Sequence, residues 1–137
     1  MKKTLLQTYT LILCIVSIFA LVSCAEKVDA TGLWENATYF SDAAVGKGEK
    51  TVTVEIIAED QSITLTVKTD KEDLGAALYE YGIINDPSFF NTCNGILASW
   101  EKDQAYWAFK SEGKMLNYGV GDAKISGGES FSIEYTK

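Results

Sequence analysis

The chain has 137 residues, with 19 acidic and 12 basic side chains, a formal net charge of −7 and no histidine. The length is that of one small domain. Every basic residue is a lysine in an acidic chain, so we expect no nucleic-acid partner. Without histidine the commonest general base and metal ligand are missing, and no Gly-x-Ser-x-Gly, Cys-x-x-Cys or Walker-type motif is present. We therefore expect no enzyme activity, no catalytic residues, no cofactor and no metal site.

Residues 1–23 have the pattern of an export signal. Lys2 and Lys3 precede an apolar run at residues 11–20, which is too short for a stable membrane span. The sequence Leu-Val-Ser-Cys that ends at Cys24 is typical of a lipobox, in which the cysteine is acylated and becomes the mature N-terminus. The alternative is an incidental cysteine in a cleaved signal. Removal of residues 1–23 takes away two lysines and no acid, so the formal charge changes from −7 to −9.

The predicted lipid anchor at Cys24 implies a location on the extracytoplasmic face of the cell membrane, or at the outer membrane if the source has one. Residues 24–30 are interpreted as a short lipidated tether. Residues 31–137 are interpreted as one domain. Its first part, residues 31–50, is too aromatic for a disordered linker, since it carries Trp34 and Tyr39, and we expect an ordered arm with room for a short edge strand.

The core of the domain, residues 51–137, begins with two strands. Apolar and polar residues alternate over 51–57 and again over 63–67, which is the period of a half-buried strand. A turn at residues 59–62 joins the two segments, so the pattern predicts a hairpin.

A helix of about ten residues is predicted next. Thr69 and Glu72 have the spacing of a capping box. Four apolar residues then fall at i, i+3, i+4 and i+7, and Gly82 is placed to end the helix in the left-handed conformation. These four residues are Leu74, Ala77, Leu78 and Tyr81.

The remaining segments read as strands and turns. Asn94 and Gly95 form a turn dipeptide, residues 105–109 a strand, residues 111–114 a hairpin turn, and residues 131–135 a final strand. The order hairpin, helix, strands predicts an α+β fold, β-grasp-like, with one helix packed on a mostly antiparallel sheet. After loss of the signal and acylation of Cys24, Cys93 is the remaining thiol, so no disulfide is expected, and we expect Cys93 to be buried.

The large aromatic residues are the candidate binding residues. Trp107 and Phe109 alternate within a strand and are assigned to the core. Trp100 lies in the polar segment 99–103, where an indole is either a lid on the core or a platform for a flat ligand. The same two alternatives, a lid on the core or a platform for a ligand, apply to Trp34 and Tyr39 in the arm.

The chain resembles a bacterial lipoprotein family built on a domain of unknown function numbered 4430. That domain is similar to the carboxy-terminal β-domain of transcobalamin and intrinsic factor. The resemblance covers nearly all of the mature chain and rests on the order and spacing of several short matches. These are Leu33-Trp34, Ala37-Thr38-Tyr39, Thr51-Val52-Thr53-Val54, Thr69-Asp70-Lys71, Leu74-Gly75, Ala77-Leu78, Asn94-Gly95-Ile96, Tyr106-Trp107-Ala108-Phe109, Gly119-Val120 and residues 131–135.

The resemblance implies a binding role. In the eukaryotic carriers cobalamin lies between a large helical domain and this β-domain, and we expect no helical domain here. The candidate ligand-binding residues are Trp100, Tyr106, Asn94, Trp34 and Tyr39. The expected function is capture of a corrinoid, another vitamin or another flat small molecule, delivered to an uptake transporter. The alternative is a protein-interaction module on the cell surface that pairs with a transporter or a larger surface protein and has no small-molecule ligand.

Overall fold

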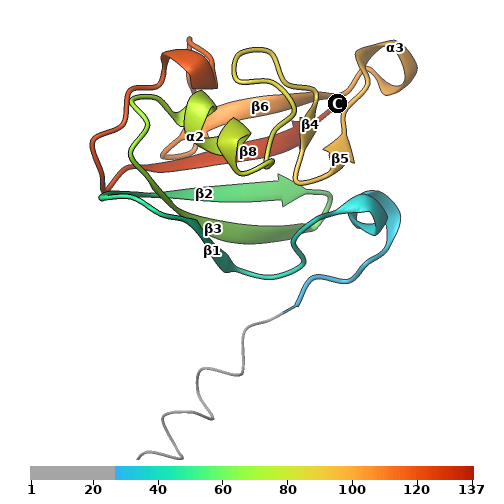
Figure 1. The fold of residues 1–137 in the computed structure, drawn as a ribbon. Coiled ribbons are helices and arrows are strands. Elements are labelled where there is room, and N and C mark those ends of the chain that lie inside the picture. The colour runs from blue at the N-terminus through green and yellow to red at the C-terminus, as the bar shows by residue number, and fades with distance from the viewer. Residues whose placement is uncertain (1–26) are drawn as a thin grey trace, which may run out of the picture.

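The computed structural model describes residues 27–137, so the predicted signal, the lipobox and Cys24 lie outside the described residues. No helix within residues 27–137 is long and apolar enough to span a membrane. Figure 1 shows the elements in space. In chain order they are η1 (Gly32–Asn36), β1 (Ala43–Gly46), β2 (Lys50–Ala58), β3 (Gln61–Thr69), α2 (Leu74–Glu80), β4 (Thr92–Cys93), β5 (Ile96–Leu97), α3 (Trp100–Asp103), β6 (Tyr106–Ser111), β7 (Lys114–Met115), η2 (Val120–Asp122) and β8 (Ser130–Thr136).

The main sheet has the strand order β1-β3-β2-β8-β6-β7, and β4 and β5 form a separate small ribbon. Three of its pairings are antiparallel, β2 with β3, β6 with β8 and β6 with β7. The pairings of β1 with β3 and of β2 with β8 are parallel. The sheet is open, and α2 lies over one face of it (Figure 1). The predicted α+β class, with one main helix on a mostly antiparallel sheet, is confirmed.

The core is built on the predicted hairpin. Val52, Val54 and Ile56 of β2 are directly opposite three apolar residues of β3, and all six are at most 2% exposed. Since side chains alternate between the two faces of a strand, the intervening residues lie on the opposite face, and they are Thr53, Glu55, Thr64 and Thr66. The register therefore places the whole apolar set on the side of the sheet that α2 covers.

The predicted capping box at the start of the helix is wrong. Asp73 is the N-cap, and its Oδ1 accepts a hydrogen bond of 2.8 Å from the backbone N–H of Ala76. Thr69 is instead the last residue of β3 and pairs with Lys50, because the strand ladder extends two residues further than the alternation indicated. The helix consequently has seven residues rather than about ten. Gly82 follows with φ of +69°, as predicted.

Two predicted turns are confirmed by their backbone angles. Asn94 and Gly95 have φ of +52° and +79° between β4 and β5, and Glu112 and Gly113 have +52° and +77° between β6 and β7. A Cβ atom on Gly95 would lie 2.3 Å from the backbone oxygen of Asn36, so this turn also requires glycine for its close approach to the arm.

The residues before the arm are hydrogen-bonded to the domain. The backbone N–H of Val28 donates to Phe40 O (2.7 Å), the N–H of Asp29 donates to Gln61 Oε1 (2.8 Å), and Gln61 Nε2 donates to Asp29 O (3.2 Å). Val28 and Asp29, which the sequence prediction assigned to the tether, therefore belong to the folded part. Further along the arm, β1 forms an edge of the sheet.

Candidate ligand-binding site

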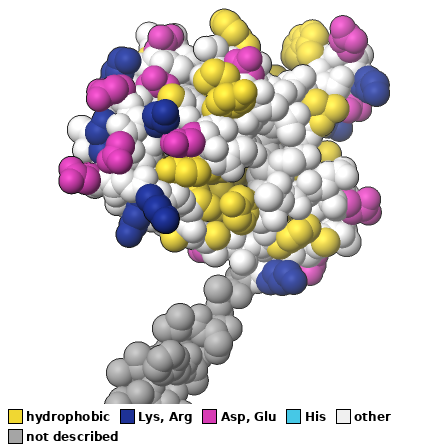
Figure 2. Space-filling view, viewed as in Figure 1, with side chains coloured by type: hydrophobic (Ala, Val, Ile, Leu, Met, Phe, Trp, Pro, Cys, Tyr) yellow, Lys and Arg dark blue, Asp and Glu magenta, His cyan; other side chains and the backbone are white. Residues whose placement is uncertain are grey.

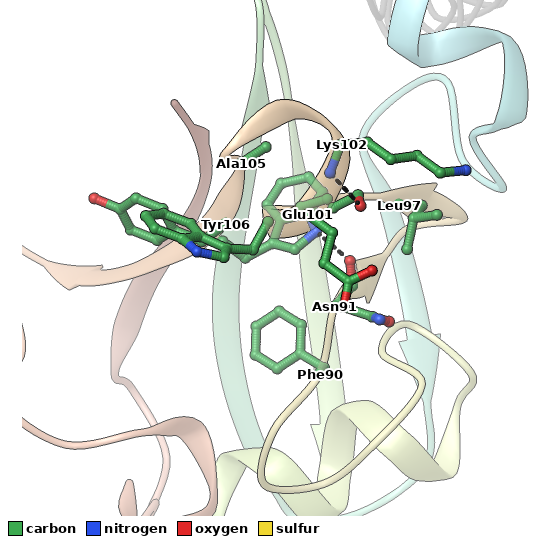
Figure 3. Close-up of a pocket in the computed structure, with 11 residues that line it drawn as sticks. Phe90, Asn91, Leu97, Glu101, Lys102, Ala105 and Tyr106 are labelled. Carbon is green, nitrogen blue, oxygen red and sulfur yellow. Dashed lines mark hydrogen bonds between the residues drawn. The ribbon is translucent and has the colours of Figure 1, made fainter.

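An open pocket of about 570 Å³ lies beside the start of β6, where the segment from β5 to β6 meets the end of the loop that follows α2 (Figure 3). In Figure 1 the helix α3, which lines this pocket, lies at the top of the molecule, whereas the described N-terminal residues begin at the bottom. Its lining combines aromatic, aliphatic and polar side chains. They are Phe90, Asn91, Leu97, Ala98, Ser99, Trp100, Glu101, Lys102, Ala105, Tyr106 and Trp107.

The short helix α3 carries the rim of this pocket. Ser99 is its N-cap, with the backbone N–H of Lys102 donating to Ser99 Oγ at 3.3 Å. Gln104 ends the helix in the left-handed conformation, and the N–H of Ala105 donates to Ser99 O at 3.2 Å. The segment therefore connects the β4–β5 ribbon to β6 of the main sheet through one hydrogen-bonded helical turn, which holds Trp100 outside the core.

Trp100 and Tyr106 present their rings to solvent at the pocket. Trp100 is 65% exposed and Tyr106 is 42% exposed, and their ring centroids are 6.3 Å apart at an interplanar angle of 58°. Trp100 is thus not one of the buried residues of the core. Two tilted aromatic rings at a pocket rim provide an apolar surface of the kind that binds a flat molecule.

Trp107 forms the back of the pocket and is 8% exposed. Its indole Nε1 donates to the backbone oxygen of Asn91 at 3.1 Å, and its ring packs edge-on against Tyr135 with centroids 5.6 Å apart. The sequence-based assignment of Trp107 to the core is confirmed, and the same residue fastens the loop before β4 to the sheet.

The charges at the pocket nearly cancel, because Glu101 and Lys102 contribute one of each sign. Within residues 27–137 no group of three or more acidic, cysteine or histidine side chains is placed to hold a metal ion. Cys93 is fully buried as expected, and burial raises the pKa of its thiol well above the ordinary range. The Cys93 thiol does not line the pocket.

Three of the predicted ligand-binding residues lie elsewhere. Trp34 is fully buried, and its Nε1 donates to Ala58 O at 3.0 Å. Asn94 is fully buried and exchanges two hydrogen bonds with the backbone of Tyr39, which is half-buried. None of the three lines the pocket. The side-chain polar groups of Trp34 and Asn94 and the backbone polar groups of Tyr39 are used inside the fold. We therefore do not include Trp34, Tyr39 or Asn94 in the site.

The pocket also contains residues that sequence reasoning did not single out as binding residues. Phe90 and Leu97 supply apolar walls, and Asn91 supplies a polar one (Figure 3). Phe90 and Leu97 each belong to an apolar pair near the Asn94-Gly95 turn. These pairs were the feature of the sequence that could have indicated an apolar wall here. Nothing local in the sequence places Asn91 beside Trp100, because that proximity depends on how two loops meet.

Comparison with solved structures supports the fold. A protein from Ruminococcus gnavus ATCC 29149, described as a "putative metal binding protein", aligns with a TM-score of 0.59 and 23% identity over 65% of this chain and 98% of that one. Haptocorrin in complex with Cbi aligns with a TM-score of 0.51 and 16% identity over 64% of this chain, which spans 25% of haptocorrin. At these identities the likeness shows the fold alone.

Sequence comparison gives the family. No curated protein matches the chain. The model of the family described as Domain of unknown function (DUF4430) matches residues 59–137, which is more than half of the chain and includes every lining residue of the pocket. The chain therefore belongs to the DUF4430 family.

Proposed function

We propose that this protein is a lipid-anchored, extracytoplasmic binding domain whose pocket takes a flat, partly apolar small molecule, with a corrinoid as the favoured class. The observation that carries the proposal is the pair of exposed rings, Trp100 and Tyr106, on one pocket of about 570 Å³. Stacking on aromatic rings suits a flat ligand. The similarity to haptocorrin, which is described in complex with Cbi, supports the choice of ligand.

The chemistry of the site favours binding over catalysis. The chain has no histidine, and its described cysteine, Cys93, is buried away from the pocket. The pocket offers neither a histidine nor a free thiol to bind the cobalt of a corrinoid. We therefore expect the bound vitamin to keep its axial ligands. A site open to solvent on one side makes fewer contacts while the cost of immobilising the ligand remains, so we expect micromolar or weaker affinity. Delivery of the ligand to an uptake transporter is part of the proposal.

Titration calorimetry of the purified protein with cobinamide and cobalamin tests the ligand. We expect binding of the wild type, and a loss of more than about 1 kcal/mol in Trp100→Ala at unchanged thermal stability, because an exposed aromatic contact is removed without opening the core. Tyr79→Ala is the matched control, since Tyr79 is 53% exposed on α2 and does not line the pocket.

Two results would end the ligand proposal. One is no heat of binding with either corrinoid at millimolar concentration. The other is an equal effect of Trp100→Ala and Tyr79→Ala on the affinity. A pull-down that recovers one transporter or surface protein regardless of added vitamin would then favour the alternative, a protein-interaction module.

The anchor has its own test. Cys24→Ala should abolish incorporation of a fatty-acid analogue in growing cells, because the thioether to diacylglycerol needs the thiol. Cys14→Ala is the control and should leave the label in place, because Cys14 lies within the segment expected to be cleaved. Label that persists on Cys24→Ala would contradict the lipoprotein proposal.

A further inference from the structure

The loop between α2 and β4 contains two asparagines whose amide orientations are fixed by the backbone. The N–H groups of Asn91 and Thr92 both donate to the side chain of Asn85, at 3.1 and 3.0 Å. A backbone N–H can only donate, so the atom of Asn85 that receives them is its oxygen, Oδ1. The other terminal atom of Asn85 is therefore Nδ2, which is a donor.

This orientation determines that of Asn91. Asn85 Nδ2 donates to the side chain of Asn91 at 2.7 Å, so the accepting atom is Asn91 Oδ1. The hydroxyl of Thr92 also donates to Asn91 Oδ1, at 3.2 Å. Nδ2 is thus the free end of the Asn91 amide, and no hydrogen bond within residues 27–137 uses its two N–H groups. Asn91 is exposed, so these N–H groups are accessible from solvent.

The main chain of Asn91 is held as firmly as its side chain. Its carbonyl oxygen accepts hydrogen bonds from the N–H of Ala98 (2.8 Å) and from the indole of Trp107 (3.1 Å). Asn91 is therefore fixed to its own loop, to the residue after β5 and to β6. Its remaining donors belong to a residue that lines the pocket beside Phe90 and Glu101 (Figure 3).

We propose, resting on the proposed function, that Asn91 Nδ2 donates a hydrogen bond to a neutral carbonyl oxygen at the edge of the ligand stacked on Trp100 and Tyr106. A donor held in place before binding loses little freedom on binding, so it adds affinity and orientation. Figure 3 places the Glu101 carboxylate on the same side of the pocket as Asn91, whereas the Lys102 side chain extends away from it. A carboxylate beside Asn91 disfavours a negatively charged group at that position, so we infer that the edge of the ligand that faces Asn91 carries a neutral carbonyl, such as a peripheral amide of a corrinoid.

Asn91→Asp is the variant that isolates this donor. The aspartate keeps an oxygen for Asn85 and Thr92 and replaces Nδ2 by a second oxygen, which repels a carbonyl. We expect unchanged thermal stability and an affinity for cobinamide lowered about fivefold or more, the value of one net hydrogen bond. The loss should persist at high salt, where the effect of the added charge alone is screened.

A second measurement reads the donor directly. In ¹H–¹⁵N spectra of the purified protein, cobinamide should shift the side-chain amide signals of Asn91. Those of Asn94 should stay in place, because Asn94 Nδ2 donates to Tyr39 O inside the fold and does not line the pocket. Fixed Asn91 signals together with unchanged affinity in Asn91→Asp would overturn the inference, and a persisting effect of Trp100→Ala would then leave the proposed function standing. Failure of wild-type protein to bind either corrinoid would overturn both.

Discussion

Replacement of Asn94 by alanine tests whether this buried asparagine has a structural role. Its Oδ1 accepts from the N–H of Tyr39 at 2.8 Å, and its Nδ2 donates to Tyr39 O at 3.0 Å. Its own N–H donates to Ile83 O and its own carbonyl accepts from Thr38. All four polar groups of Asn94 are therefore used to join the arm and the loop after α2 to the β4–β5 turn.

The expected cost of Asn94→Ala has two parts. Loss of the two side-chain hydrogen bonds to Tyr39 costs about 2 kcal/mol, at about 1 kcal/mol net for each. Alanine at a φ of +52° adds about 1 kcal/mol, since the left-handed region is unfavourable for a residue with a Cβ and a non-polar side chain. A total of about 3 kcal/mol corresponds to a fall in the melting temperature of about 15 °C for a domain of this size.

The assay is urea denaturation followed by circular dichroism, with Asn94→Gly as the matched control. Glycine removes the same hydrogen bonds but tolerates the positive φ, so Asn94→Gly should be more stable than Asn94→Ala by about 1 kcal/mol. Neither variant should change the affinity for cobinamide once measured below its unfolding transition. A cost of less than about 1 kcal/mol in Asn94→Ala, or weaker ligand binding at unchanged stability, would refute the structural role.

Two further predictions concern stability. Asp73→Ala should lower the free energy of unfolding by about 1 kcal/mol because it removes the cap of α2, whereas Asp73→Ser should restore most of this stability. Equal stability of the wild type and Asp73→Ala in thermal melts would contradict the assigned cap. Burial raises the pKa of the Cys93 thiol, so above about pH 8.5 the unfolded chain releases a proton that the folded chain keeps, and stability falls as the pH rises. The stability of Cys93→Ala should lack this contribution, so the difference from the wild type should change between pH 8 and 10, and a constant difference would argue against a buried neutral thiol.

The features that sequence reasoning predicted well are those whose cause is local. The β2–β3 hairpin follows from alternation within each strand, and the Asn94-Gly95 turn follows from two residues that tolerate positive φ. The prediction of a capping box was wrong because it rested on local spacing, whereas the conformation of Thr69 is decided by a contact with a neighbouring strand. Thr69 could cap a helix or extend a strand, and its pairing with Lys50 on the neighbouring strand decides for the strand.

The residues considered for the binding site also fall into those that the local sequence could predict and those that it could not. Trp100 and Tyr106 are close in sequence on either side of one short excursion, so their juxtaposition could be anticipated. Trp34 could not be assigned, because its burial depends on the arm folding back against the end of β2. The wall formed by Phe90 and Asn91 depends on the contact of two loops, which leaves no periodicity or spacing in the sequence.

Asn85, Asn91 and Asn94 are three residues of the same type in one region. Their hydrogen bonds distinguish the residues with a structural role from the candidate binding residue. Asn85 uses its side chain to hold the loop, and Asn94 uses every polar group to hold the arm. Asn91 uses its carbonyl and Oδ1 in the same manner but keeps two donors at a pocket wall. A folded domain gains stability from groups that are paired, whereas a ligand can pair only with groups left over. Asn91 is exposed, so its unpaired donors beside the exposed rings of Trp100 and Tyr106 are the polar groups of this region that stay available to a ligand.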